Sequence, residues 1–276
     1  MFGALIGAAA GTLILTGGGF GPGVAERFGA LAGADARIIY IPSASSGIRL
    51  PSGFIWIPPE QPDATHNDDA FAGEIARLLH VGSVEILHSR DRRFWNSDET
   101  AARIGRTRAI WISGGNAGRL ADLMLGTKAE AALKRVYASG GVIGGESAGS
   151  IVIGSFIVRG RPDKPVLMAA GRERGFGILP GVAIDPHLAE SKRENELIQV
   201  VDAHPELLGI GIDESAAIVV SGTQFDVIGQ GRVAIYDNQK HGDTWYYELP
   251  VGSRFDLANR QRSAIRDRDP GSQIRD

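Results

Sequence analysis

Short apolar segments alternate with amphipathic ones along the first 155 residues. Most of the apolar segments are followed by glycine or small hydroxyl residues, and the segments cover 12–16, 37–42, 84–87, 109–112 and 142–143. Between them, 68–79 and 128–138 have helical periodicity. Continuous apolar strands alternating with helices are typical of a parallel sheet covered on both faces. We therefore predict a doubly wound α/β unit, mostly parallel and flanked by helices.

The pattern changes after Gly181. The segments 209–220, 224–227 and 232–236 are apolar and separated by short turns such as Ser221-Gly222. They predict antiparallel strands that extend the same sheet rather than a separate domain. We expect one α/β domain over residues 1–253, followed by a mobile tail over 254–276, where charged residues dominate.

A proline-rich segment, 46–67, interrupts the alternation. It predicts a long loop near the ends of the strands, where the chemistry of such sheets collects. A lid and a solvated insertion are equally open interpretations.

The composition excludes several kinds of chemistry and argues against two classes of partner. The 276 residues include no cysteine, which excludes disulfides, thiolate chemistry and cysteine-based zinc sites. The net charge of -3 argues against a nucleic-acid partner. No apolar run is long enough for a transmembrane helix, so we expect no membrane partner. A cytoplasmic location is preferred, and an export signal before the first strand stays open.

The segment Gly145-Glu146-Ser147-Ala148-Gly149 fits G-x-S-x-G between a strand and a helix. That context is the one required of a nucleophile elbow, in which the serine hydroxyl stands out from the sheet edge. Ser147 is therefore the candidate nucleophile. The alternative is a glycine-rich turn whose serine caps a helix.

A nucleophilic serine needs a base and an acid that orients the base. Among the six histidines, His187 follows the apolar run 181–184, and Glu214 follows the apolar run that ends at Ile212. A structural histidine and an ordinary strand-end acid are the alternatives. The order Ser, His, Glu argues against an α/β-hydrolase, in which the histidine comes last.

Two backbone N–H groups are candidates for an oxyanion hole. Ala148 follows the serine, and Gly115 lies in Ser113-Gly114-Gly115-Asn116, at the end of the neighbouring strand. The alternative is a glycine turn that only joins strand to helix. The whole set needs neither metal nor cofactor.

Together these motifs resemble peptidase family S51, which includes cyanophycinase and the aspartyl dipeptidase peptidase E. The resemblance spans roughly residues 11–237 and is carried, in the family's order, by 15–19, 37–45, 113–116, 144–150, 185–188 and 209–214. It implies a Ser-His-Glu triad of Ser147, His187 and Glu214, on a fold like the class I glutamine amidotransferases. The Asp-x-His segment favours the cyanophycinase branch.

The resemblance also implies the substrate-binding residues Asn116, Asp185 and Arg193. Several positions depart from the family's pattern: Ala117, Glu146, Pro186, Ser191 and Glu196. Ser191 and Glu196 stand where the family carries arginines that hold substrate carboxylates, which puts polymer cleavage in doubt.

We therefore expect a serine peptidase that hydrolyses aspartyl or isoaspartyl bonds of a small peptide. An amidase or esterase with the same triad, or a non-catalytic binding protein on this fold, stays open. A homodimer is compatible with the resembled family.

Overall fold

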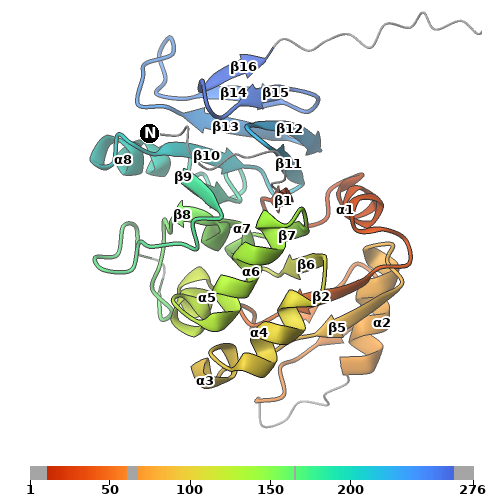
Figure 1. Ribbon diagram of the computed structural model, residues 1–276. Coiled ribbons are helices and arrows are strands. Elements are labelled where there is room, and N and C mark those ends of the chain that lie inside the picture. The colour runs from red at the N-terminus through yellow and green to blue at the C-terminus, as the bar shows by residue number, and fades with distance from the viewer. Residues whose placement is uncertain (1–10, 61–67, 165, 264–276) are drawn as a thin grey trace, which may run out of the picture.

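A nine-stranded sheet forms the centre of the computed structural model, which describes residues 11–60, 68–164 and 166–263 (Figure 1). In spatial order its strands are β16 (Gln261–Ser263), β15 (Arg254–Asp256), β12 (Gln224–Gly229), β11 (Ala216–Ser221), β1 (Thr12–Thr16), β7 (Val142–Glu146), β6 (Ala109–Ile112), β2 (Arg37–Ile41) and β5 (Ser83–Ile86). Five neighbouring strands run parallel to one another, namely β1, β7, β6, β2 and β5. The strand β11 pairs with β1 in the antiparallel direction. The predicted mixed α/β architecture with a large, mostly parallel sheet is confirmed.

Helices cover both faces of this sheet. Alternate residues of each strand belong to different cores, as Ile39 and Tyr40 of β2 do. One face packs on α1 (Val24–Ala32) and α2 (Asp68–Leu78). The other packs on α3 (Arg92–Trp95), α4 (Asp98–Gly105), α5 (Ala117–Met124), α6 (Lys128–Ala138) and α7 (Ala148–Ile153).

A second sheet of five strands lies beside the first. Its order is β14 (Tyr247–Pro250), β13 (Arg232–Tyr236), β10 (Leu208–Ile212), β9 (Leu179–Pro186) and β8 (Gly154–Phe156), and α8 (Glu196–Ala203) covers its outer face. Its inner residues share a core with the large sheet. The segment 209–220, expected as a single strand, is divided by the turn at Asp213–Ser215, so β10 and β11 belong to different sheets.

Two further predictions differ from the structure. Within the proline-rich segment, β3 (Ile48–Arg49) and β4 (Ile55–Trp56) form a small hairpin with Trp56 buried, while 61–67 lie outside the described residues. The tail predicted from Arg254 instead begins with β15, which pairs with β12 and buries Phe255 completely. Among the many charged residues of this segment, Phe255 and Leu257 pack into the core. Residues 264–276 are outside the described part.

Candidate active site

Ser147 occupies the sharp turn between β7 and α7. Its backbone has φ 47 and ψ -108, an unusual conformation for a residue with a side chain. Its N–H donates to the Thr16 carbonyl oxygen at 3.2 Å. The flanking glycines permit the close approach of strand and helix: a Cβ on Gly145 would lie 2.8 Å from the Gly149 carbonyl carbon. The turn therefore holds the Ser147 hydroxyl beyond the carboxyl end of β7.

His187 lies directly after β9 and reaches Ser147 from the second sheet. Its Nε2 is 2.9 Å from the Ser147 Oγ. Its Nδ1 is 3.7 Å from Glu214 Oε2, an ion-pair distance that is longer than a hydrogen bond. Glu214 lies in the turn between β10 and β11, and its side chain is 49% exposed. The structure thus brings together the three residues singled out as nucleophile, base and orienting acid.

Gly18, in the loop after β1, packs against this pair. A Cβ on Gly18 would lie 2.6 Å from His187 Nδ1 and 2.6 Å from Glu214 Cγ. Only a residue without a side chain fits there without displacing one of the two. Gly18 lies within the matching segment 15–19, and no role was predicted for it from the sequence.

The turn after β6 forms the other side of the site. Gly115 has φ 132, and a Cβ there would lie 2.7 Å from the Ser45 N. A Cβ on the neighbouring Gly114 would lie 3.3 Å from the Ser147 Cβ. Ala148 is the first residue of α7, so its N–H has no acceptor within the helix. Both predicted oxyanion donors therefore belong to segments in contact with Ser147.

Glu146 precedes Ser147, and its side chain is on the same sheet face as Tyr40 and Trp111. Burial raises the pKa of its carboxyl from 4.5 to about 7, and the charge of Glu214 acts in the same direction. The Gly114 N–H and the Trp111 indole oppose this rise. Burial also raises the pKa of Tyr40, and the Glu146 charge adds to it.

The three residues expected to bind substrate have different environments. Asn116 caps α5: its Oδ1 accepts from the Arg119 N–H at 2.8 Å, and its Nδ2 donates to two backbone carbonyls at 3.3 Å. Asp185 is fully buried and accepts from Arg159 at 2.6 and 3.2 Å. Arg193 stands 4.0 Å from the same carboxylate, and its side chain is 28% exposed.

Arg159 was not anticipated from the sequence. It also contacts Glu196 and so joins the loop after β8 to the start of α8. Burial raises the pKa of Asp185, and the Arg159 guanidinium opposes that rise. No local motif marks Arg159, because its partner is 26 residues further along the chain.

A second serine-histidine-glutamate arrangement occurs at the ends of β2 and β5. Ser43 Oγ is 3.0 Å from His88 Nδ1, and His88 Nε2 is 2.9 Å from Glu60 Oε2. Ser43 is completely buried, so its hydroxyl is out of reach of a substrate. This arrangement ties two strand ends together, and burial lowers the pKa of His88.

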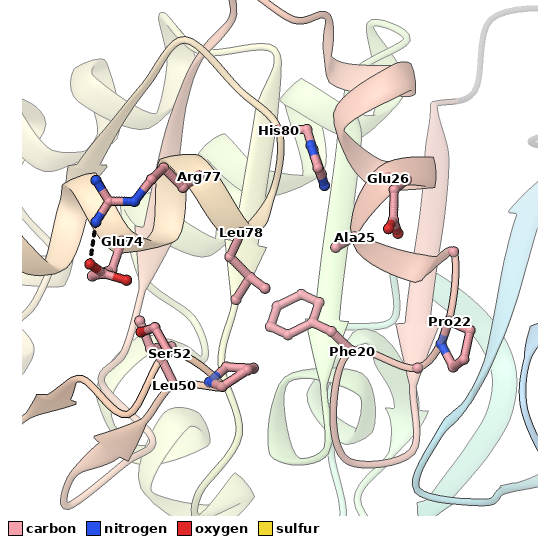
Figure 2. Close-up of a pocket in the computed structure, with 13 residues that line it drawn as sticks. Phe20, Pro22, Ala25, Glu26, Leu50, Ser52, Glu74, Arg77, Leu78 and His80 are labelled. Atoms are coloured by element: carbon pink, nitrogen blue, oxygen red, sulfur yellow. Dashed lines mark hydrogen bonds and ion pairs between the residues drawn. The ribbon is translucent and has the colours of Figure 1, made fainter.

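A pocket of about 510 Å³ lies between α1, α2 and the β3–β4 hairpin (Figure 2). Figure 2 shows the Phe20 ring pointing toward Leu78 across it, and an ion pair between Glu74 and Arg77 at its edge. Phe20 packs on Trp111 with ring centroids 4.7 Å apart. The Trp111 indole in turn acts on the Glu146 carboxyl, and neither of these two residues lines the pocket.

Within residues 11–60, 68–164 and 166–263, no three or more histidine or acidic side chains are grouped to hold a metal ion. None of the helices described there has the length and apolarity to cross a membrane.

The structure defines a mixed α/β protein, and comparison with known proteins assigns its family. Residues 61–228 match the model of peptidase family S51. A cyanophycinase of Synechococcus elongatus is 32% identical over 241 residues, covering 86% of this chain and 70% of the relative. One of Geminocystis herdmanii is 30% identical, covering 79% and 76%. The chain belongs to peptidase family S51 and is a peptidase-type hydrolase.

Solved structures share the fold. A peptidase from an acI-B1 Actinobacterium aligns with a TM-score of 0.65 at 22% identity, covering 90% of this chain and 97% of the other. A putative peptidase E protein from Listeria monocytogenes aligns with a TM-score of 0.55 at 18% identity, covering 81% and 100%.

Proposed function

We propose that this protein is a serine peptidase that hydrolyses aspartyl or isoaspartyl bonds of the cyanophycin type through a Ser147-His187-Glu214 triad. The observation that carries the proposal is the 2.9 Å separation of Ser147 Oγ from His187 Nε2, at a strained strand-to-helix turn. Membership of peptidase family S51 and the cyanophycinase relatives support the choice of bond.

In the acylation step, Ser147 Oγ attacks the amide carbonyl carbon and its proton passes to His187 Nε2. The imidazolium then gives that proton to the leaving amine, and the C–N bond breaks. Water attacks the ester with His187 again as base, releasing the acid and restoring the serine. Glu214 stabilises the imidazolium and favours the tautomer with the proton on Nδ1.

The tetrahedral oxyanion would be stabilised by the N–H groups of Ala148 and Gly115. Their segments both touch Ser147, and the positive φ of Gly115 sets the orientation of its peptide. The turn at Ser147 then acts as a nucleophile elbow, and the fold as a relative of the class I glutamine amidotransferases.

On the substrate side, Arg193 is the group we assign to a substrate carboxylate, because its guanidinium is partly exposed. Asp185 is buried beneath it and would act by orienting Arg159 and Arg193. Asn116 would act through its cap on α5, which fixes the turn that carries Gly115.

A substrate panel tests the proposal. Purified protein would be given α-aspartyl dipeptides, β-aspartyl dipeptides, cyanophycin, non-aspartyl dipeptides and simple esters, with Ser147→Ala as control. We expect release of amino acid from aspartyl or β-aspartyl peptides by wild type only. Turnover confined to esters or non-peptide amides would overturn the substrate assignment, and equal turnover by Ser147→Ala would overturn the mechanism.

A further inference from the structure

The residue before the nucleophile, Glu146, is a carboxyl group that the mechanism above does not use. It ends β7, and its register partner on β1 is Thr16. Parallel neighbours in register point to the same sheet face, so Thr16, Glu146 and Trp111 line one face. That face otherwise packs on apolar residues of α1.

One buried hydrogen-bonding group on this face, Thr16 Oγ1, has no hydrogen-bond partner among the described residues. An unpaired buried donor costs free energy, so such groups are uncommon in a well-packed core. The Trp111 indole acts on the Glu146 carboxyl and stabilises its ionised form. The side chains beneath the nucleophile are thus arranged around this carboxyl.

The Glu146 carboxyl also lies against the turn after β6, which carries Gly114 and Gly115. A Cβ added to Gly114 would lie 3.4 Å from Glu146 Oε1 and 3.3 Å from the Ser147 Cβ. The Gly114 N–H interacts with the same carboxyl. Gly114 precedes Gly115, whose N–H is assigned to the oxyanion. The position of Glu146 therefore affects the orientation of the Gly114–Gly115 peptide, whose N–H is assigned to the substrate oxyanion.

We propose, resting on the function proposed above, that Glu146 is a positioning residue that orients the Gly114–Gly115 turn and must be neutral for turnover. As a neutral acid it contacts the turn without opposing negative charge on the substrate oxygen. As a carboxylate it places a second negative charge beside that oxygen, in a half-buried site where water screens the repulsion only in part.

Both protonation states of Glu146 are accessible near neutral pH, because burial and Glu214 raise its pKa while the Gly114 N–H and the Trp111 indole lower it. Tyr40 of β2 is buried and uncharged, Thr16 of β1 and Trp111 of β6 carry no charge, and Glu214 adds negative charge from the turn after β10. Burial and Glu214 together raise the pKa of Glu146 to about 7. Its ionisation thus falls within the range in which the enzyme would work.

The test compares pH profiles of kcat for wild type, Glu146→Gln and Glu130→Gln on the substrate identified by the panel. Glu130 is a buried carboxyl on α6, bonded to Lys134, and controls for neutralising any buried acid. Wild type and Glu130→Gln should lose about tenfold in kcat per pH unit above the Glu146 transition. Glu146→Gln should keep its acid limb and lose this alkaline limb.

A second measurement does not depend on activity. Carboxyl-carbon NMR of glutamate-labelled protein should show one resonance that titrates near pH 7, absent from Glu146→Gln. An unchanged alkaline limb in Glu146→Gln, or a resonance that titrates at the usual glutamate pH, would overturn the proposal. Failure of the proposed function looks different, because wild type itself would then turn over no peptide.

Discussion

Gly18 packs so closely on His187 that an added Cβ would lie 2.6 Å from its Nδ1. The same carbon would lie 2.6 Å from Glu214 Cγ. The loop after β1 therefore packs against both His187, the proposed base, and Glu214, its orienting acid. Glycine is required at position 18 because a side chain there would collide with both.

Gly18→Ala should lower kcat about a hundredfold, because the methyl group forces His187 or Glu214 away from the reactive arrangement. Gly19→Ala is the matched control, since a Cβ on Gly19 meets nothing within 4 Å. Steady-state kinetics with thermal unfolding of both variants would check this. Wild-type kcat in Gly18→Ala would show that the packing does not set the geometry.

Arg159→Gln should destabilise the protein by about 3–5 kcal/mol, because it leaves the buried Asp185 carboxylate without its main partner. Arg172→Gln, which breaks the exposed pair with Asp122, should cost less than about 1 kcal/mol. Urea unfolding of the two variants measures both values. If both variants lost less than about 1 kcal/mol of unfolding free energy, the buried Asp185 carboxylate would not depend on Arg159 for its stabilisation.

Arg193→Gln should raise KM for an aspartyl substrate about tenfold to a hundredfold and change kcat little, since it removes a charge-assisted bond to the substrate carboxylate. Arg172→Gln again serves as control, because Arg172 pairs with Asp122 away from the proposed site. If KM were unchanged and kcat fell, Arg193 would instead act on the reacting groups through Asp185.

Glu146 should make stability depend on pH. Its pKa is raised from 4.5 to about 7 in the folded protein, so between these values folding takes up a proton. Its contribution to stability is complete below about pH 4.5 and is lost as the pH rises through about 7, a change of up to about 3 kcal/mol.

The difference in unfolding free energy between wild type and Glu146→Gln isolates this contribution from other titrating groups. Urea titrations at about pH 5 and about pH 8 should show wild type losing stability relative to the variant. A difference that is the same at both pH values would mean that Glu146 ionises normally in the folded protein.

Much of the fold was predictable from the sequence because the parallel strands are continuous apolar runs. The strand Ala109–Ile112 and the helix Lys128–Ala138 have the predicted bounds. The second sheet was not predicted, because 209–212 and 216–220 are both apolar and only the short Asp213–Ser215 turn separates β10 from β11. The start of β15 was missed because Phe255 is a single apolar residue between charged ones.

The candidate site was predictable where residues follow strand ends, as Ser147, His187 and Glu214 do. Arg159 and Gly18 were not assigned roles, because each matters through a contact with a residue distant in sequence. The burial of Asp185 could not be inferred from Asp185-Pro186-His187 alone, since it depends on how β9 packs between β8 and β10.

The most direct test of the proposed mechanism is labelling with a fluorophosphonate probe, followed by mass spectrometry to locate the label. The set comprises wild type, Ser147→Ala, His187→Ala and Ser43→Ala, the last of which removes the buried serine beside His88. We predict a label on Ser147 in wild type and Ser43→Ala, and none in Ser147→Ala or His187→Ala. A folded wild type that takes no label, or a label that persists in Ser147→Ala, would contradict the assignment of Ser147 as the activated nucleophile.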